Sequence, residues 1–405
     1  MTSFSNVSIP LYEFDQLGGI KPNPIFHRPW DKLHSRCIEY PFAASQADGA
    51  QRLLDVGTVK ADPAWLSWLE ALQIEVHATD YDAPLRMFNR VCFHQADVRD
   101  LPIQEDYFDK IMAVSVIEHI GLASPQVMAS ELPQVDPHGD LDAVLELARV
   151  LKPGGELIMT FPFGVADELI LGGEARNYTS QSIKRFNLAL EPVRLDYYEY
   201  QYRDKQIICD EYGDSGAESR RVQQKLTLQP DLLLPPPVDM LPGVVTWRRV
   251  PKETTAARQK HHVDGVLCGV WRKPLDPSSA HAYSSPAARQ NKKGECLFEC
   301  GAREEALAAF ERAIHLEPSY APAYGNLAVL YWMKGDGEQA YNCIRRALTL
   351  DPGNRLAVLN ALDIFTGLQL HDESIQACRG YLVEHGRDEE LEERLAALEA
   401  KRSGA

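Results

Sequence analysis

Between residues 50 and 275, short apolar runs alternate with stretches of helical periodicity. Alternation of this kind is typical of an α/β fold, in which a doubly wound and mostly parallel sheet carries helices on both faces. Seven runs predict seven strands: RLLDV, IEVHATD, VCFHQAD, DKIMAVSV, ELIMTF, VRLDYYEY and VDGVLCGVW. Sheets of this type bind ligands beyond the carboxyl ends of their strands, so the residues that follow each strand are the candidates for chemistry.

A second pattern follows, with a period of 34 residues. Pro318 returns as Pro352 and Gly301 as Gly335, and small residues recur between them at the same offset. This period, with small residues where two helices cross and a proline closing each unit, resembles the tetratricopeptide repeat. The resemblance implies two regular units, a degenerate third unit from Arg355 and an acidic capping helix. We therefore expect an all-α repeat domain after the α/β domain.

The two patterns divide the 405 residues into four predicted parts. A helical or lid segment precedes the α/β domain, and a linker rich in Pro, Ser and Ala separates that domain from the repeats. Within the α/β domain, the stretch LQPDLLLPPPVDMLPG contains three consecutive prolines, which exclude a central strand or helix there. The predicted boundaries are 1–49, 50–276, 277–286 and 287–405.

Net charge and cysteine spacing indicate which binding partners and which cell compartment to expect. The net charge of −16 argues against a general nucleic-acid or anionic-membrane surface. No run reaches the ~18 apolar residues that a membrane span needs, and the N-terminus lacks the pattern of a signal peptide. The eight cysteines are scattered without a CxxC pair. Cys296 and Cys300 lie four residues apart in a helical pattern, which fits either a metal site or, as the favoured interpretation, small buried residues on one helix face. We expect a reduced, cytoplasmic protein that neither binds nucleic acid nor inserts into membranes.

The first two predicted strand ends carry acids. The first strand runs into Asp55 and Gly57, and the second ends at Asp80, 25 residues after Asp55. An acid at the second place can accept hydrogen bonds from both hydroxyls of a ribose. The first turn resembles the first motif of the class I S-adenosylmethionine-dependent methyltransferases, where a glycine-rich turn lets the backbone approach the cofactor. That family usually has two further glycines, and Val59 and Ala61 occupy their places here.

Later strand ends extend the resemblance to that family. AD-x-x-x-LP, FD-x-I, S-V-I-E-H-I-G and LKPGG occur in this order, and the ordered set is far more specific than any one piece. The resemblance implies that Asp97 contacts the adenine amino group, that the amide of Val98 contacts the ring, and that Ser115 lies at the cofactor. The glycines of LKPGG are expected to supply positive φ angles for a tight helix-to-strand turn. The chain lacks G-x-G-x-x-G and G-x-x-x-x-G-K-[ST], which argues against a nicotinamide dehydrogenase and a nucleotide hydrolase.

A narrower resemblance concerns the segments around the predicted pocket. Glu39 lies in an R-x-x-E-Y-P pattern before the first strand, and Asp140 lies in a D-P-x-G-D stretch after S-V-I-E-H-I-G. Both patterns, with the later Arg176 and Tyr178, resemble bacterial methyltransferases associated with glycan and surface-polysaccharide gene clusters. The resemblance implies that Glu39 closes over the cofactor and that Arg176, Tyr178 and Asp140 bind the acceptor. The alternative for Glu39 is an ion pair with Arg36 at the surface. The alternative for Arg176 and Tyr178 is a lid that faces solvent.

His119 is the candidate general base, because it follows the fourth strand and an imidazole has a suitable pKa near neutrality. The competing interpretation is a packed, hydrogen-bonded histidine that caps the following helix. A further hypothesis places a divalent cation among Glu118, His119, Asp136 and Asp140, where it would orient two neighbouring sugar hydroxyls. Asp-Pro and Gly-Asp are also ordinary turn residues, which favours a site without metal.

The resemblance as a whole implies an S-adenosylmethionine-dependent methyltransferase that acts on an oxygen of a sugar, a glycan or a related small molecule. The opposing hypothesis is a non-catalytic adaptor, in which the α/β domain has lost its cofactor and the repeats bind a partner. Val59 and Ala61 motivate the adaptor, whereas the retained Asp80 and Asp97 argue against it. The repeats are expected to recruit a protein partner, to mediate self-association or to pack on the catalytic domain.

Overall fold

The computed structural model describes residues 35–123, 127–129, 133–202, 245–251, 265–276 and 282–402. The start of the predicted lid segment and the proline-rich stretch lie outside these residues. The chain divides into two compact units, Met1–Ala280 and His281–Ala405. The division falls within the stretch predicted as a linker.

The first unit contains an eight-stranded sheet in the order β3-β2-β1-β4-β5-β10-β8-β9. The first five strands of this order are parallel, and β10, β8 and β9 each pair antiparallel with the strand before them in the order. The strands are β1 (Arg52–Val56), β2 (Glu75–Asp80), β3 (Val91–Gln95), β4 (Phe108–Val114), β5 (Leu151–Pro162), β8 (Glu191–Tyr202), β9 (Val245–Val250) and β10 (Gly265–Arg272). The predicted doubly wound, mostly parallel fold is confirmed. All seven predicted strands form, and β9 is an additional strand that the sequence reading did not predict.

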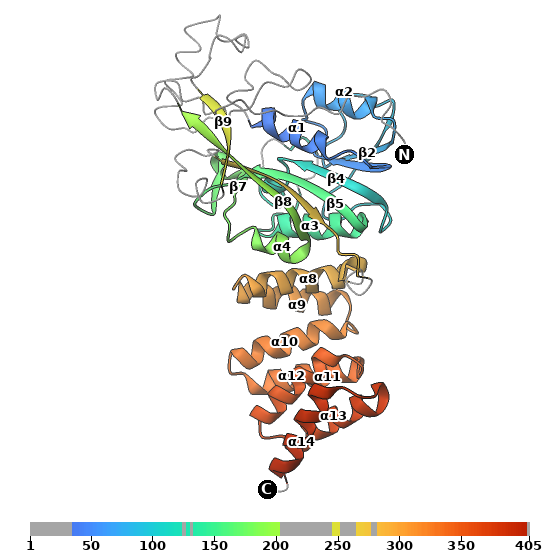
Figure 1. Cartoon of the computed structure of the whole chain (residues 1–405), viewed down its shortest axis with the longest axis vertical. Coiled ribbons are helices and arrows are strands. Elements are labelled where there is room, and N and C mark those ends of the chain that lie inside the picture. Colours follow the sequence, from blue (N-terminus) through green and yellow to red (C-terminus); the bar gives the residue numbers. More distant parts are fainter. Residues whose placement is uncertain are drawn as a thin grey trace, which may run out of the picture. The chain divides into compact units, whose positions relative to one another are not determined.

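Helices cover both faces of the sheet, as Figure 1 shows. The helices α1 (Arg36–Ser45) and α2 (Pro63–Ala71) lie on one face, and α3 (Gly139–Val150) and α4 (Lys184–Ala189) lie on the other. An apolar core forms between the first face and its helices, where Trp65 and Trp68 of α2 pack with Val76 and Ala78 of β2. Because side chains alternate along a strand, the next residue of β2, His77, faces the other side of the sheet.

Shorter elements follow the central strands. The 3-10 helix η1 (Ile117–His119) comes directly after β4, and a hairpin of β6 (Glu168–Ile170) and β7 (Ala175–Asn177), with η2 (Leu171–Gly173) between them, comes after β5. The LKPGG sequence joins α3 to the sheet with no intervening coil, because β5 begins at Leu151. Gly154 has a φ of +76°, whereas Gly155 has no positive φ. Only one of the two glycines therefore supplies the positive φ that the sequence predicted.

Within residues 286–402, the second unit has three helix pairs and a final helix. The pairs are α8 (Pro286–Glu299) with α9 (Arg303–Leu316), α10 (Ala321–Met333) with α11 (Gly337–Leu350), and α12 (Arg355–Gly367) with α13 (His371–His385), and the final helix is α14 (Glu389–Arg402). The helix boundaries reproduce the 34-residue period, including the start of the third unit at Arg355. This confirms the predicted all-α repeat domain.

Small residues sit where the paired helices cross. Gly294 of α8 is required there, because a Cβ at this position would lie 2.4 Å from the ring of Phe310 in α9. In the third pair Ser374 takes the place of the small apolar residue, is fully buried and donates its hydroxyl to the carbonyl of Leu370. The other predicted crossing residues are buried as well: Ala306, Ala313, Ala340 and Ala347. Among the helices that the structure describes, none has the length and apolar character that crossing a membrane requires.

Candidate active site

A cavity of about 330 Å³ opens at the carboxyl ends of β1, β2, β3 and β4. This volume is within the range of small-molecule sites, and the location is where open α/β sheets hold their ligands. Arg36 and Tyr40 of α1 line one side, and Leu171 and Glu174 of the β6–β7 hairpin line another. Seven of the residues selected from the sequence also line it: Asp55, Gly57, Asp80, Asp97, Val98, Ser115 and His119.

The turn after β1 depends on Gly57. Its φ is +79°, and a Cβ there would lie 2.3 Å from Cγ2 of Val116, so a larger residue would force this turn apart. Its amide donates to the carbonyl of Thr79 on the neighbouring strand, at 2.9 Å. Val59 and Ala61 have no positive φ, so the turn as formed does not require glycine at those places. Val59 is buried, and Ala61 lines the cavity.

Asp55 is the buried acid beneath that turn. One carboxylate oxygen accepts the hydroxyl of Thr58 at 2.7 Å, and the other accepts the indole N–H of Trp65 at 3.0 Å. Burial raises the pKa of Asp55 to about 7, and the two hydrogen bonds offset only part of that effect. Both oxygens therefore fix the turn to α2, and the residue shapes the cavity wall.

Asp80 at the end of β2 presents a carboxylate that the backbone holds in place. Its Oδ2 accepts the amide of Val59 at 2.8 Å, and its Oδ1 accepts the amide of Asp82 at 3.0 Å. Burial raises the pKa of Asp80 above its ordinary value. Each oxygen keeps a second lone pair, so the group can still accept two hydroxyl protons from a ligand. Asp82, two residues on, instead holds the amides of Met128 and Ala129 with its own carboxylate.

Asp97 after β3 is paired within the protein. The Nη2 and Nε atoms of Arg99 lie 2.7 Å and 3.0 Å from its two carboxylate oxygens, and Nη1 of Arg99 also donates to the carbonyl of Gln134. Val98 beside it is buried and forms the cavity wall. The guanidinium of Arg99 thus orients the carboxylate of Asp97, and lone pairs of the carboxylate oxygens remain for the amino group of a ligand.

His119 ends η1 with its ring at the cavity. Its Nδ1 lies 2.6 Å from the carbonyl oxygen of Glu174, and a carbonyl can only accept, so Nδ1 carries the proton. In the neutral ring Nε2 is therefore the lone-pair nitrogen. The side chain is 38% exposed, and Nε2 lies 3.9 Å from Oε1 of Glu118. The geometry leaves Nε2 available as a proton acceptor.

The carboxyl group of Glu118 is buried next to this histidine. Ser115, whose φ is +52°, donates its hydroxyl to Oε1 of Glu118 at 2.5 Å. The second oxygen of Glu118 is buried and has no hydrogen-bond partner. Burial raises the pKa of Glu118, so a proton is retained there more readily than on an exposed glutamate.

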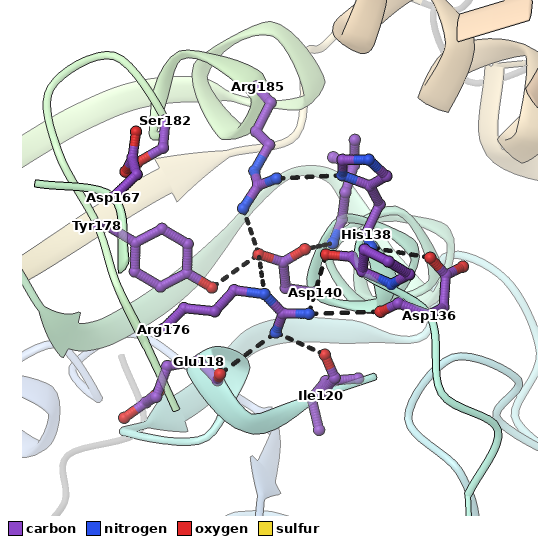
Figure 2. Close-up of polar contacts among 12 residues, drawn as sticks. Glu118, Ile120, Asp136, His138, Asp140, Asp167, Arg176, Tyr178, Ser182 and Arg185 are labelled. Atoms are coloured by element: carbon purple, nitrogen blue, oxygen red, sulfur yellow. Dashed lines mark hydrogen bonds and ion pairs between the residues drawn. The ribbon is translucent and has the colours of Figure 1, made fainter. Parts of the chain in front are cut away.

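Arg176, Tyr178 and Asp140 do not line the cavity. Figure 2 shows them in one polar network that reaches the backbone of Glu118 and Ile120, the two neighbours of His119 in sequence. Asp140 is fully buried, and its Oδ2 accepts the hydroxyl of Tyr178 at 2.7 Å and Nη2 of Arg185 at 2.5 Å. Burial and the nearby Asp140 raise the pKa of Tyr178 well above its usual value.

The guanidinium of Arg176 joins two loops. Nη1 donates to the carbonyl of Ile120 at 2.7 Å and to that of Glu118 at 3.3 Å, and Nη2 donates to that of Pro137 at 3.0 Å (Figure 2). The two carbonyls bound by Nη1 flank His119 on either side. Arg176 therefore fixes the backbone from which the histidine projects.

Glu39 also lies outside the cavity. Its buried carboxylate accepts the hydroxyl of Ser35 at 2.9 Å and forms an ion pair with Arg36. The pair that the sequence raised as an alternative therefore forms, with Arg36 rather than Glu39 at the cavity. Tyr40, one helical turn beyond Arg36, also lines the cavity and stacks on Trp65 with ring centroids 4.7 Å apart.

Sequence reasoning missed Tyr40, although it shares a helix face with Arg36. It also missed Glu174, whose carbonyl sets the tautomer of His119. That contact involves a backbone atom 55 residues away, which no local pattern signals.

The four residues considered for a divalent cation do not gather as ligands. Asp140 is bound by Tyr178 and Arg185, and Asp136 accepts the amide of His138 at 2.8 Å. Within the described part of the chain, the metal-ligand atoms that cluster belong to other residues. The cation hypothesis for this cavity is therefore not supported.

Comparison with known proteins agrees with both units. A family model described as a methyltransferase domain matches residues 54–159, and one described as a tetratricopeptide repeat matches residues 297–362. The curated relative Methyltransferase GfsG from Streptomyces halstedii is 28% identical in an alignment 166 residues long that covers 38% of this chain. The match spans about half of that relative, 51% of its length.

Two solved structures are similar at lower identity. A 1,6-didemethyltoxoflavin-N1-methyltransferase from Burkholderia thailandensis, with bound S-adenosylhomocysteine, is 14% identical with a TM-score of 0.32, covering 58% of this chain and 77% of that chain. The first repeat domain of Spaghetti (RPAP3), bound to an HSP90 peptide, is 18% identical with a TM-score of 0.27, covering 29% of this chain and 95% of that chain. Residues 54–159 thus belong to a methyltransferase domain, which this chain joins to C-terminal tetratricopeptide repeats.

Proposed function

We propose that the chain is an S-adenosylmethionine-dependent methyltransferase that methylates an oxygen of a sugar, a glycan or a related small molecule. The observation that carries the proposal is one cavity lined both by a carboxylate suited to a ribose and by an imidazole with a free lone pair. The match of residues 54–159 to a methyltransferase domain supports the reaction class.

The residues of the cavity fit the cofactor. Asp80 would accept the two ribose hydroxyls, since backbone amides already orient both of its oxygens. Asp97 would accept the adenine amino group beside the apolar wall of Val98. Gly57, which has no side chain, exposes its backbone atoms to the same cavity. Ser115 lines the same cavity, and its hydroxyl is directed to Glu118.

Bound S-adenosylmethionine supplies a methyl group on a positively charged sulfur. His119 would take the proton from the acceptor hydroxyl at Nε2 while the oxygen–carbon bond forms and the sulfur–carbon bond breaks. The carbonyl of Glu174 holds the tautomer that makes Nε2 the acceptor. The cavity walls align acceptor and donor, which is the larger part of catalysis for a direct displacement.

Arg176, Tyr178 and Asp140 receive a positioning role in this proposal. Their side chains are buried and point to one another, so they would act on the acceptor through the loop that carries His119. Glu39 would likewise act through Arg36, which it pairs with at the cavity edge.

The acceptor class rests on the R-x-x-E-Y-P and D-P-x-G-D patterns and not on any contact in the cavity. The repeat domain would bind a protein partner or a second copy of the chain, since stacked repeats present extended binding surfaces. The sequence has no CxxC pair among its scattered cysteines, which supports action in the reducing cytoplasm.

Calorimetric titration of the full chain with S-adenosylhomocysteine tests the proposal. We expect binding by the wild type and a loss of at least about tenfold in Asp80→Asn, because one neutral amide replaces a charged acceptor of two hydroxyls. Asp48→Asn makes the same chemical change on an exposed residue and is expected to bind normally. His119→Gln is also expected to keep its affinity, because the role assigned to His119 is proton transfer.

Absence of binding by the folded wild-type chain would contradict the enzyme assignment and favour the adaptor. Equal affinity of wild type and Asp80→Asn would remove the ribose assignment while leaving the enzyme assignment in place.

A further inference from the structure

A cluster of metal-ligating side chains lies on the outer strands of the sheet, apart from the residues that line the cavity. His77 of β2 is paired in register with Cys92 of β3, and His94 follows two residues later on the same face of β3. This face is opposite to the one that α1 and α2 cover, and Tyr107 and Phe108 flank His77 there. Two histidines and one cysteine from adjacent strands thus project together.

The ligand atoms of this trio are close to the spacing of a tetrahedral site. All three lie within 4.8 Å of one another. Nδ1 of His77 is 2.8 Å from Nε2 of His94, and Sγ of Cys92 is 3.7 Å from the same Nε2. Bond lengths of about 2.0–2.1 Å to nitrogen and about 2.3 Å to sulfur separate tetrahedral ligands by about 3.3–3.6 Å. The nitrogen pair is about half an ångström closer than this and the sulfur–nitrogen pair is slightly farther apart, so entry of an ion would move the two imidazole rings apart.

A carboxylate already orients the first ligand. Nε2 of His77 lies 2.9 Å from Oε1 of Glu75, and an ionised carboxylate only accepts, so His77 carries its proton on Nε2. The lone pair of His77 is therefore on Nδ1, which is directed to His94. Glu75 is itself held by the hydroxyl of Tyr107 and by Nε of Arg52, at 3.2 Å in the latter case. A histidine whose second nitrogen donates to a fixed carboxylate is the usual arrangement behind metal ligands.

The protonation pattern leaves one exchangeable proton at the centre. With a lone pair on Nδ1 of His77, the close contact requires that His94 donate its Nε2 proton. A metal ion that enters would replace that proton and the thiol proton of the exposed Cys92.

We infer that His77, Cys92 and His94 form a binding site for a borderline divalent metal ion such as Zn²⁺. Two imidazoles and one thiolate are the donor set that such ions prefer, and hard ions such as Mg²⁺ and Ca²⁺ disfavour it. Three protein ligands leave the fourth position to water. The ion would link β3 to β2 through their side chains. Asp80 is the last residue of β2, and Gln95 is the last residue of β3.

Titration of the full chain with Co²⁺ tests the site, because a cobalt–thiolate bond gives a near-ultraviolet charge-transfer absorption. We expect one ion per chain with that absorption, and displacement of Co²⁺ by Zn²⁺. Cys92→Ser removes the thiolate from an exposed position and is expected to abolish the absorption. Cys300→Ser makes the same change in the repeat domain and is expected to retain it.

The Glu75→Gln variant distinguishes a metal site from three side chains that only form hydrogen bonds with one another. Weakening of Zn²⁺ affinity by about 10- to 100-fold, with unchanged stoichiometry, is expected from loss of the carboxylate behind His77. A charge-transfer absorption that survives in Cys92→Ser, or its absence in the wild type, would overturn the inference. S-adenosylhomocysteine titrations of the same samples report on the cavity separately, so failure of one proposal does not imply failure of the other.

Discussion

The carboxyl group of Asp55 shows how one residue can serve two purposes. In sequence it is the acid of the first strand-end motif, and the natural expectation is contact with a ligand. In the structure both of its oxygens accept hydrogen bonds from the protein, from Thr58 and Trp65. The acid is retained because it joins the turn at Gly57 to the first residues of α2, and this holds the cavity wall.

Asp55 also predicts how stability depends on pH. Its pKa is 3.8 when exposed and about 7 in the folded chain, so the folded state binds the extra proton between these values. The stability that this group contributes is therefore lost as the pH rises towards 7, by about 1.4 kcal/mol per pH unit. Asp55→Asn does not charge, and its amide oxygen can still accept the indole N–H of Trp65 while its NH2 group donates to the hydroxyl of Thr58 in a reversed bond. We expect the thermal midpoint of the variant, measured against that of the wild type, to rise between pH 6 and pH 8.

Asp109→Asn is the matched control for that measurement. Burial alone would raise the pKa of Asp109. Its hydrogen bonds with Lys152 and with the amides of Arg52 and Gln51 have the larger combined effect, so the pKa of Asp109 is lowered. The stability from Asp109 is present above the ordinary pKa and is lost only as the pH falls below it. Its variant is expected to be destabilised equally at pH 6 and pH 8. A pH-independent difference for Asp55→Asn would contradict the raised pKa.

Elements differ in how far sequence could predict them. The seven predicted strands carry their own apolar runs, and the helix pairs carry the 34-residue period, so local pattern was sufficient. The strand β9 follows the proline-rich stretch, and its sequence VTWRRV has no clear apolar run. It forms by pairing with β8, where Trp247 lies opposite Tyr200. That pairing is a tertiary contact, and no residue within β9 signals it.

In the candidate site, too, some residues could be placed from local sequence and others only from tertiary contacts. Residues directly after a strand, such as Asp80 and Asp97, line the cavity because the fold alone places them there. Residues from loops were harder to place. Arg176 was predicted to meet the acceptor, yet its donors are directed to backbone carbonyls that only the folded loops bring together. The trio around His77 became visible only with the register of β2 and β3.

Two glycines test the packing of the repeat helices. Gly294 in α8 faces the buried ring of Phe310, and a Cβ at this site would lie 2.4 Å from it. Gly325 in α10 has nothing within 4 Å of the same atom. Alanine forms helices better than glycine by about 1 kcal/mol, so Gly325→Ala is expected to be neutral or stabilising. Gly294→Ala is expected to lose about 1–3 kcal/mol, because it overfills the crossing.

Thermal unfolding followed by circular dichroism measures both variants. The two substitutions have the same chemistry and the same intrinsic helix preference, so the difference between them reports the crossing alone. Equal midpoints for the two variants would show that α8 and α9 can separate without loss of stability, against the packing described here.

The chain contains two compact units, and the described residues of each form apolar clusters. One core lies between the sheet and the helices α1 and α2, and others lie between the repeat helices. The division at Ala280 and His281 follows from the contacts within each unit. Units with independent cores unfold as independent cooperative transitions unless a large interface couples them.

Calorimetric unfolding of the full chain is therefore expected to show two transitions that respond to different changes. S-adenosylhomocysteine at 100 times its dissociation constant would stabilise the first unit by about 2.7 kcal/mol, because only the folded cavity binds it. The Gly294→Ala substitution would lower the midpoint of the other transition and leave the ligand-dependent one in place. A single transition moved by both changes would show that the two units unfold as one, and the repeats would then contribute directly to the stability of the cavity. Independent shifts would instead leave the repeat domain free to exchange partners without altering the cofactor affinity of the catalytic unit.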